Sequence, residues 1–286
     1  MLDLTKLKVC IIGSRGQMGS LFKQCWSGKV GDICSLDRKP GAETLEPADM
    51  AQIVPHADVL LISVPLSRFE SVITAVAPYL SSNTILSDVS SVKTIPMELM
   101  QKHHTGPVVG THPLFGPLSF RPAAPGLPAP AEDNRAEQFL KAEFHGLGSQ
   151  VALTPAPNCP PHALETICAL FRLAGCNTFT ASAAEHDRAI AVIQSLNFLS
   201  NLAYFAVASE IPDLEKYITP SFARRLLSGR SMLQEDAGLF TNIARHTPDL
   251  QRTVQSYVRI LEKAGRLDDE TLNTLLQQIG RYFKPL

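Results

Sequence analysis

Short apolar runs alternate with amphipathic stretches through the first 181 residues, and this alternation constrains the fold more than any other feature. Several runs are continuously apolar, as in strands that are buried on both faces of a parallel sheet. Strands are expected at residues 8–12, 32–37, 58–65, 83–89, 107–112, 150–155 and 176–181. Connecting helices are expected at residues 17–27, 68–80, 95–103 and 161–175. The pattern predicts an α/β fold with a doubly wound parallel sheet.

The character of the sequence changes after Ser182, where strand patterns give way to helical ones. Ser182 followed by Glu185 fits a capping box that opens a long apolar helix. Further helices are expected at residues 219–230, 236–246, 248–265 and 268–283. We therefore expect an α/β domain over residues 1–182 and an all-α domain over residues 183–286. A Pro-rich stretch at 121–130 is expected to be an irregular loop.

One uncharged run, at residues 189–208, has the length of a membrane span. Its polar side chains would need partners in lipid, namely Gln194, Ser195, Asn197, Ser200 and Asn201. A helix buried in protein is favoured, because a helix that is apolar on most of its circumference must be covered on most sides. Pairing of two copies is the simplest cover, which predicts a homodimer through the C-terminal helices; a monomeric bundle is the alternative.

Composition excludes several classes of partner and site. The 26 Lys and Arg nearly cancel the 27 Asp and Glu, so no global field favours nucleic acid or an anionic membrane. Six cysteines without a C-x-x-C pair, and a start without a basic-then-apolar leader, predict a reducing cytoplasmic compartment. The eight histidines show no metal-ligand spacing, and His186, beside the capping glutamate, is expected to be structural. A small-molecule substrate and no metal are the expectation.

The segment "VCIIGSRGQMGSLF" joins a predicted strand to a predicted helix through three glycines. Glycines let the chain turn tightly and let a pyrophosphate approach the helix N-terminus, whose free N–H groups attract it. The spacing G-x-x-G-x-x-G is less specific than the commoner G-x-G-x-x-G, so the motif alone is weak. The candidate cofactor-binding residues here are Gly13, Ser14, Arg15, Gly16, Gln17, Met18 and Gly19.

The second predicted strand ends in Asp37, where a carboxylate accepts hydrogen bonds from the ribose hydroxyls of a dinucleotide. This favours NAD over NADP, although Arg38 beside it is able to pair with a 2′-phosphate. Ser63, Val64 and Pro65 end another strand and are further cofactor candidates, because ligands of open sheets bind at strand carboxyl ends. A glycine turn without a ligand is the alternative for the whole region.

The stretch "GTHPLFGP" presents His112 at the end of a predicted strand, because Pro113 and Pro117 prevent any regular element from continuing. The preceding strand ends in "SDVSSVK", which contains Ser91. Parallel topology places Ser91 and His112 on the same carboxyl edge as the glycine loop. A turn histidine satisfied by the backbone is the alternative interpretation of His112.

Five segments together resemble the prephenate dehydrogenase family over most of the chain. They are "GSRGQMGSLF", "DVLLISVPLSRFESVI", "LSDVSSVK", "GTHPLFGP" and "EHDRAIAVIQSL". The last is most similar to the dehydrogenase half of bifunctional chorismate mutase–prephenate dehydrogenases. The resemblance implies a Rossmann-type domain, a helical dimerisation domain and NAD-dependent oxidative decarboxylation of a cyclohexadiene to an aromatic arylpyruvate. It further implies that His112 is the catalytic acceptor for the proton of the C4 substituent, and that Ser91 helps to orient this histidine and the substrate. Ser91 is also a candidate cofactor-binding residue.

Two positions depart from the family pattern. Phe198 stands where the pattern has a histidine in the substrate pocket, and Ser231 stands where it has a carboxylate-binding arginine. Arg230 is adjacent, and Arg224 and Arg225 lie about two helical turns away. The candidate substrate-binding residues are Gln194, Asn197, Phe198, Arg224, Arg225, Arg230 and Ser231.

The departures bear on the identity of the substrate. Removing positive charge lessens repulsion of an ammonium group at C4, and close unit charges interact by about 1 to 4 kcal/mol at partly wet sites. This favours 4-amino-4-deoxyprephenate, giving 4-aminophenylpyruvate, and a sequence without a mutase segment fits such a specialised enzyme. Prephenate, giving 4-hydroxyphenylpyruvate in tyrosine biosynthesis, is the first alternative, and arogenate is the second.

Two other interpretations stay open. A 3-hydroxyacid or imine dehydrogenase would need a catalytic lysine or aspartate in the long apolar helix, where the sequence has Gln194 and Asn197. A non-catalytic NAD-binding regulator would account for the two departures, but retention of Ser91 and His112 argues against it.

Overall fold

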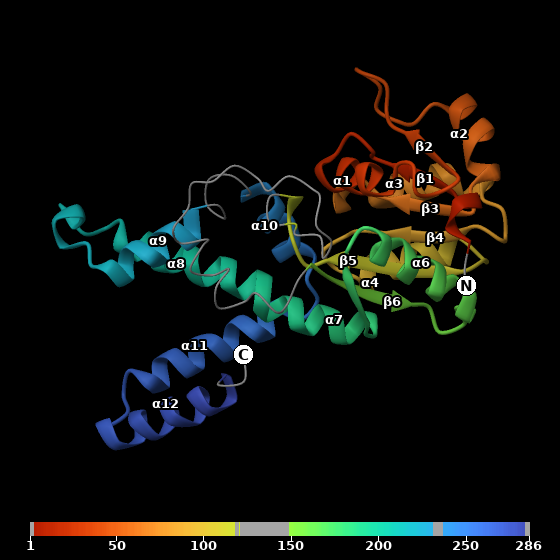
Figure 1. Cartoon of the computed structure of the whole chain (residues 1–286). Helices are drawn as coiled ribbons and strands as arrows, with labels where there is room; N and C mark the ends of the chain where they lie inside the picture. Colours follow the sequence, from red (N-terminus) through yellow and green to blue (C-terminus); the bar gives the residue numbers. More distant parts are fainter. Residues whose placement is uncertain (1–2, 118–119, 121–148, 231–236, 284–286) are drawn as a thin grey trace. The chain divides into compact units, whose positions relative to one another are not determined.

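The computed structural model describes residues 3–117, 120, 149–230 and 237–283. Seven strands form one sheet in the order β2-β1-β3-β4-β5-β6-β7 (Figure 1). The strands are β1 Lys8–Ile12, β2 Asp32–Leu36, β3 Val59–Ile62, β4 Ile85–Asp88, β5 Val108–Pro113, β6 Gln150–Pro155 and β7 Asn177–Thr180. Each of the seven expected runs forms a strand, which confirms the Rossmann-type α/β fold.

Strand β6 departs from the expected all-parallel sheet, because it runs antiparallel to β5 with His112 opposite Ala152. The other neighbouring pairs are parallel. An antiparallel neighbour begins at the end of the sheet where its partner stops, so the intervening chain does not have to cross the sheet. The sheet is therefore mostly parallel, with one reversed pair.

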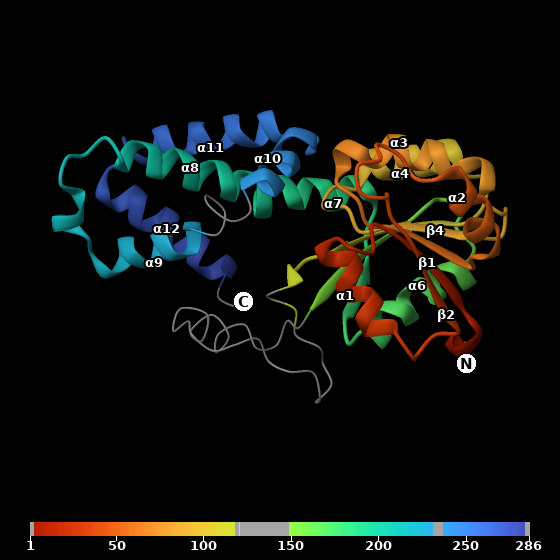
Figure 2. The ribbon, with the colours of Figure 1, turned by 90° about the horizontal axis from the view of Figure 1, so that it is seen from above.

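Helices cover both faces of this sheet (Figure 2). One face carries α1 and α6, and the other carries α2, α3 and α4. The helices are α1 Gln17–Trp26, α2 Pro47–Ile53, α3 Leu66–Val76, α4 Thr94–His103, α6 Pro161–Leu173 and α7 Ala183–Ile190. Single turns of 3-10 helix lie at Leu4–Lys6, Val54–His56 and Ala77–Tyr79. Helix α2 was not expected, since its seven residues are too few to show a helical period.

An aromatic cluster joins α1 to α6. Phe22 stacks on Trp26 with ring centroids 5.2 Å apart, and Phe171 meets both rings edge-on. Trp26 Nε1 donates a hydrogen bond of 2.7 Å to the carbonyl oxygen of Leu170, so its one polar atom is satisfied in the core. This packing fixes α1, and with it the loop that precedes α1.

After Ile190 the described chain is helical, as the sequence predicts. The elements are a π-helical segment Ala191–Leu196, α8 Asn197–Ala208, a 3-10 helix Leu214–Tyr217, α9 Pro220–Arg230, α10 Ala237–His246, α11 Leu250–Ala264 and α12 Asp269–Phe283. The capping box before α7 is present, because Ser182 Oγ donates to Glu185 Oε2 and accepts from the N–H of Glu185. The Pro-rich stretch 121–130 lies outside the described residues.

The helix over Ala183–Ala208 is long and apolar enough to cross a membrane: an 18-residue window of it has a mean hydropathy of 1.5, and 28% of that window is buried. The expectation of a helix buried within the protein is therefore not met in the single chain. Val192 is 53% exposed, and Ile193 and Val207 are each 65% exposed. The π-helical segment packs against α10 and α11, while its residues Val192 and Ile193, and Val207 of α8, stay exposed.

Two compact units make up the described chain. The first comprises the residues up to 120 together with 149–190, and the second comprises residues from 191 onward. Helix α7 belongs with the first unit because it packs on α4. The domain boundary after residue 182 remains a prediction, and these contacts favour a boundary at the end of α7.

Candidate active site

The loop after β1 has two positions that only glycine fits. Gly13 has a φ of +83°, and a Cβ there would lie 2.2 Å from the carbonyl oxygen of Ser63. A Cβ on Gly19 would lie 2.3 Å from the carbonyl oxygen of Gly13. Gly16 caps α1 without a side-chain hydrogen bond. The loop therefore brings the ends of β1 and β3 together and leaves the start of α1 free of a side-chain cap, as an anion site requires.

This loop lies where the strand order reverses, because β1 has β2 on one side and β3 on the other. At such a switch point the carboxyl ends of the strands leave a crevice in which open α/β sheets bind dinucleotides. Gly13 follows β1, Asp37 follows β2 and Ser63 follows β3, with Val64 and Pro65 leading into α3. The fold thus brings the predicted cofactor residues of three strand ends to one edge.

Asp37 is held against the glycine loop. Ser14 Oγ donates to Asp37 Oδ2 at 2.7 Å, and the N–H of Arg15 donates to Oδ1 at 3.2 Å. Each carboxylate oxygen keeps a further lone pair for another donor. Arg38 is exposed, and its guanidinium donates to the carbonyl oxygen of Ala42 at 2.9 Å. The Asp37 carboxylate is therefore hydrogen-bonded to the glycine loop, while the Arg38 guanidinium is hydrogen-bonded to the turn that contains Ala42.

His112 lies near the end of β5 and is 3% exposed. Its Nδ1 lies 2.9 Å from Nε2 of His186, on α7. Nδ1 of His186 lies 2.8 Å from Oδ1 of Asp187. Two imidazoles and one carboxylate therefore form a hydrogen-bonded line at the carboxyl edge of the sheet.

Asp187 also caps α4. Its Oδ1 accepts the N–H of Lys93 at 2.7 Å, and its Oδ2 accepts the N–H of Thr94 at 2.8 Å. These N–H groups belong to the start of a helix, where backbone donors lack intrahelical partners and favour a negative charge. The cap ties α7 to α4 and so fixes the position of His186.

A buried ion pair lies beside this line. Lys93 Nζ donates to both carboxylate oxygens of Asp88, at 2.7 and 2.6 Å, and to the carbonyl oxygen of Thr111 at 2.5 Å. The N–H of Thr111 donates to Asp88 Oδ1 at 3.2 Å. Both charged side chains are fully buried. Since a buried pair is tolerated only when such bonds satisfy it, the pair locks the ends of β4 and β5 together, next to His112.

Burial and the neighbouring charges set the protonation states. Burial, together with the nearby His186 and Lys93, lowers the pKa of His112 well below its ordinary value. Burial tends to raise the pKa of Asp187, but hydrogen bonds from His186, Thr94 and Lys93 outweigh it and lower the pKa. At neutral pH the line therefore has an ionised carboxylate at one end and a neutral imidazole at the other.

From the sequence, His186 was expected to be structural, and Asp187 had no expected role. Their local sequence signal is a run of four polar residues, 185–188, at the start of a mostly apolar helix. In the folded chain both are buried, at 5% and 2% exposure, and the ring of His186 faces His112. Their importance depends on a contact across 74 residues, which no local pattern reveals.

Ser91 lies half-buried in the turn between β4 and α4. The neighbouring Ser90 donates its N–H to Asp88 Oδ2 at 2.9 Å, and within the described chain its buried Oγ has no hydrogen-bond partner. The recorded partner of His112 is His186, so the role of Ser91 in orienting His112 stays a prediction.

Three of the expected substrate residues lie at the start of the second unit. Among the described residues, the buried Oε1 of Gln194 has no hydrogen-bond partner. It lies in the π-helical segment, a feature often found at functional sites. Asn197 Oδ1 accepts from the Asn201 amide at 3.1 Å. Phe198 is 6% exposed and stacks on Phe240, with ring centroids 5.6 Å apart.

The arginine candidates differ in their surroundings. Arg225 donates from Nε to Asn201 Oδ1 at 3.3 Å, and its guanidinium carbon lies 3.8 Å from the ring centroid of Tyr204. It also lines a hollow of about 430 Å³ in the second unit. Arg224 is exposed. Arg230 ends α9, and the placement of its side chain, like the whole of Ser231, lies outside the described structure.

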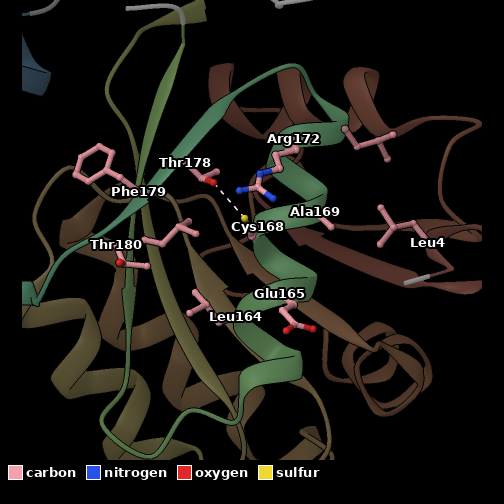
Figure 3. A pocket seen from close by; sticks show the side chains of 11 residues that line it. Leu4, Leu164, Glu165, Cys168, Ala169, Arg172, Thr178, Phe179 and Thr180 are labelled. Carbon is pink, nitrogen blue, oxygen red and sulfur yellow. Dashed lines mark hydrogen bonds between the residues drawn. The ribbon is translucent and has the colours of Figure 1, made fainter. Parts of the chain in front are cut away.

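A separate hollow of about 740 Å³ lies between α6 and the edge strand β7 (Figure 3). Its lining includes Glu165, Cys168 and Arg172 of α6, and Cys168 Sγ lies 3.1 Å from Thr178 Oγ1. It includes no predicted cofactor or substrate residue. Over the described ranges, no group of three or more His, Cys, Asp or Glu side chains is arranged to hold a metal ion.

Comparisons with known proteins agree with the fold and with the residue pattern. The family model described as the nucleotide-binding domain of prephenate dehydrogenase matches residues 34–125. The T-protein of Haemophilus influenzae is 27% identical over 243 residues, which cover 82% of this chain and 55% of that protein. The chain thus spans about half the length of this relative.

Two solved structures share the fold. Prephenate dehydrogenase from A. aeolicus, in complex with hydroxyphenyl propionate and NAD+, has a TM-score of 0.74 at 19% identity, over 98% of each chain. Synechocystis arogenate dehydrogenase has a TM-score of 0.71 at 20% identity, over 98% of this chain and 100% of its own. In its sequence and its fold, the chain is similar to the prephenate dehydrogenase family.

Proposed function

We propose that the protein catalyses the NAD-dependent oxidative decarboxylation of a prephenate-type cyclohexadiene to an aromatic arylpyruvate. The observation that carries this proposal is a neutral, buried His112 on the same carboxyl edge as the glycine loop. The two solved structures with this fold are named as an arogenate dehydrogenase and a prephenate dehydrogenase, which supports the reaction class.

The residues at the switch point fit a dinucleotide. A side chain at Gly13 or Gly19 would occupy the space in which the backbone approaches the strand ends, and the N-terminus of α1 attracts a pyrophosphate. Asp37 keeps acceptor capacity for the ribose hydroxyls and repels a 2′-phosphate, which favours NAD over NADP. Ser63, Val64, Pro65 and Ser91 complete the proposed cofactor site. NAD, when bound, supplies the acceptor for the hydride that leaves C4.

His112 supplies the base. As the hydride leaves C4 and carbon dioxide leaves C1, the C4 substituent must lose a proton, and a neutral imidazole accepts it. The lowered pKa of His112 keeps the ring unprotonated at neutral pH. A general base of this kind accelerates a reaction by roughly 10²- to 10⁴-fold.

For the substrate we propose 4-amino-4-deoxyprephenate, with prephenate and then arogenate as alternatives. Phe198 is an apolar, stacked side chain at the position where the family pattern has an imidazole. The Oε1 of Gln194, which has no hydrogen-bond partner among the described residues, is an acceptor suited to an N–H or O–H donor. The names of the relatives support the cyclohexadiene class and do not support the amine. Asn197, Arg224, Arg225, Arg230 and Ser231 complete the proposed substrate residues.

Steady-state kinetics with the three substrates tests the proposal. NADH formation is followed by absorbance with each substrate, and with NADP in place of NAD. The highest kcat/KM with 4-amino-4-deoxyprephenate is expected; a higher value with prephenate would overturn the charge argument while leaving the reaction class intact. NAD binding without oxidation of any of the three would point to a regulator.

We further propose a cytoplasmic homodimer that binds neither membrane nor nucleic acid. Helix α11 has 15 residues and none of them is buried, although Ile260 and Leu261 are apolar. A second copy that covers this face would remove the apolar surface from water. The near-zero net charge and the six free thiols fit the absence of nucleic acid and a reducing compartment.

A further inference from the structure

In the hydrogen-bonded line from Asp187 to His112, the chemistry of each group determines which atom donates and which accepts. An ionised carboxylate accepts hydrogen bonds and has none to donate. Its two oxygens already accept the N–H groups of Lys93 and Thr94, which hold the charge in place. The proton between Asp187 Oδ1 and His186 Nδ1 therefore belongs to the imidazole.

The position of that proton determines whether Nε2 of His186, on the other side of the ring, donates or accepts a hydrogen bond. In its neutral form the His186 imidazole carries one N–H, so with Nδ1 protonated its Nε2 offers a lone pair. Nδ1 of His112, 2.9 Å away, must then donate to it. Neutral His112 is left with its own lone pair on Nε2, and no hydrogen bond among the described residues engages that nitrogen.

We propose that Asp187 and His186 are positioning residues that hold His112 in one tautomer, with its proton on Nδ1 and its basic lone pair on Nε2. The inference rests on the proposed function, because it names the nitrogen that takes the proton from the C4 substituent. The same logic governs catalytic triads, in which a carboxylate holds an imidazole in the productive tautomer.

Burial of the three residues makes the tautomer of His112 depend strongly on its contact with His186. His112, His186 and Asp187 are 3%, 5% and 2% exposed, so water has little access to replace a lost partner. The Lys93–Asp88 pair beside them is satisfied by its own contacts and offers no acceptor that the structure records at Nδ1 of His112. Without His186, the ring of His112 would exchange between tautomers, and the form protonated on Nε2 cannot act as a base there.

Two substitutions at one position separate this role from a structural one. In His186→Gln the side-chain carbonyl can still accept the Nδ1 proton of His112, whereas His186→Leu has similar bulk and no acceptor. At metal sites, loss of a partner that orients a ligating imidazole typically costs roughly 10- to 100-fold, and we take this as the scale for His112. We expect kcat to fall by this factor in His186→Leu, to recover most of its value in His186→Gln, and KM for NAD to stay nearly unchanged in both.

The tautomer itself is read by nitrogen-15 NMR of the full-length protein labelled at histidine, since protonated and unprotonated ring nitrogens differ in chemical shift. The signals of His112 are assigned from a His112→Gln sample. In the wild type and in His186→Gln, Nε2 is expected to be unprotonated; in His186→Leu, a mixture of tautomers is expected.

The outcomes are distinguishable. A wild-type spectrum with Nε2 of His112 protonated overturns the inference even if the leucine variant fails to fold. Unchanged tautomer and kcat in a folded His186→Leu protein also overturn it, and leave the proposed function standing. A tautomer shift in a protein that oxidises no cyclohexadiene would instead support the inference about the histidines and reject the proposed function.

Discussion

The two units of the molecule place opposite kinds of groups in unfavourable surroundings. The first unit buries charge, since Lys93, Asp88 and Asp187 are 0–2% exposed. The second unit exposes apolar surface, since Ile260 and Leu261 on α11 are each 60% exposed. Both arrangements cost free energy in an isolated chain, the first by desolvation and the second by hydration of apolar groups.

The difference lies in how each cost is offset. In the first unit each of these three buried charges has hydrogen-bond partners within the same unit. In the second unit the exposed residues of α11 and α12 have no cover that the described chain supplies. The buried, hydrogen-bonded charges of the first unit are typical of a site for chemistry. The exposed apolar residues of the second unit are typical of a protein–protein interface. Four experiments test this contrast.

The largest effect is expected at the buried imidazole. His112→Asn should lower kcat by roughly 10²- to 10⁴-fold, because it removes the proposed base, while leaving NAD affinity unchanged. Steady-state rates and a cofactor titration measure the two quantities. His56→Asn, the same substitution at an exposed histidine, is the matched control and should behave as wild type. Wild-type kcat in His112→Asn would remove His112 from the mechanism.

Introducing a charged side chain on α11 tests whether the second unit forms a dimer interface. Ile260→Glu places a carboxylate on the exposed apolar face and should convert dimers to monomers, because burying an unpaired charge is strongly unfavourable. Light scattering coupled to size exclusion gives the mass. Gln251→Glu adds the same charge to an exposed polar position of α11 and should leave the dimer intact. A monomeric wild type would contradict the dimer proposal.

The glycine loop allows backbone strain to be separated from steric clash. Gly13→Ala combines a φ of +83° with a Cβ 2.2 Å from the Ser63 carbonyl oxygen, whereas Gly28→Ala has a φ of +70° and nothing within 4 Å. Left-handed strain alone costs about 1 to 3 kcal/mol, and Gly13→Ala should lose more than Gly28→Ala. Denaturant unfolding measures both, and NAD affinity should fall only for Gly13→Ala. Equal losses in the two variants would argue against the close approach.

The smallest effect is a dependence of stability on pH. The pKa of His112 is lowered in the folded state, so the unfolded chain binds more protons once the pH falls below about 6.5. The stability of the native state should therefore be greatest above that pH and decrease below it, by at most about 1.4 kcal/mol per pH unit for this group. Unfolding curves between neutral and mildly acidic pH measure the slope. His112→Gln should have a shallower slope, and an unchanged slope would count against a buried neutral His112.

Much of the fold was predictable because its signals are local. Continuous apolar runs mark strands that are buried on both faces, and the capping box at Ser182 marks the start of α7. The glycine loop and Asp37 could be proposed as a cofactor site for the same reason, since strand, turn, helix and acid follow one another within 30 residues. Helix α2 and the direction of β6 were missed, because a short helix shows no period and a strand pattern carries no direction.

The sequence by itself determined the Rossmann-type sheet, the helical second part and the strand-end positions of Gly13, Ser91 and His112. Only the tertiary structure decided that His186 lies between Asp187 and His112, and that α11 keeps its apolar face in solvent. The physical reason is that periodicity and turn chemistry act between near neighbours in the chain. A hydrogen bond across 74 residues, or the cover of a helix face, depends on how distant elements pack.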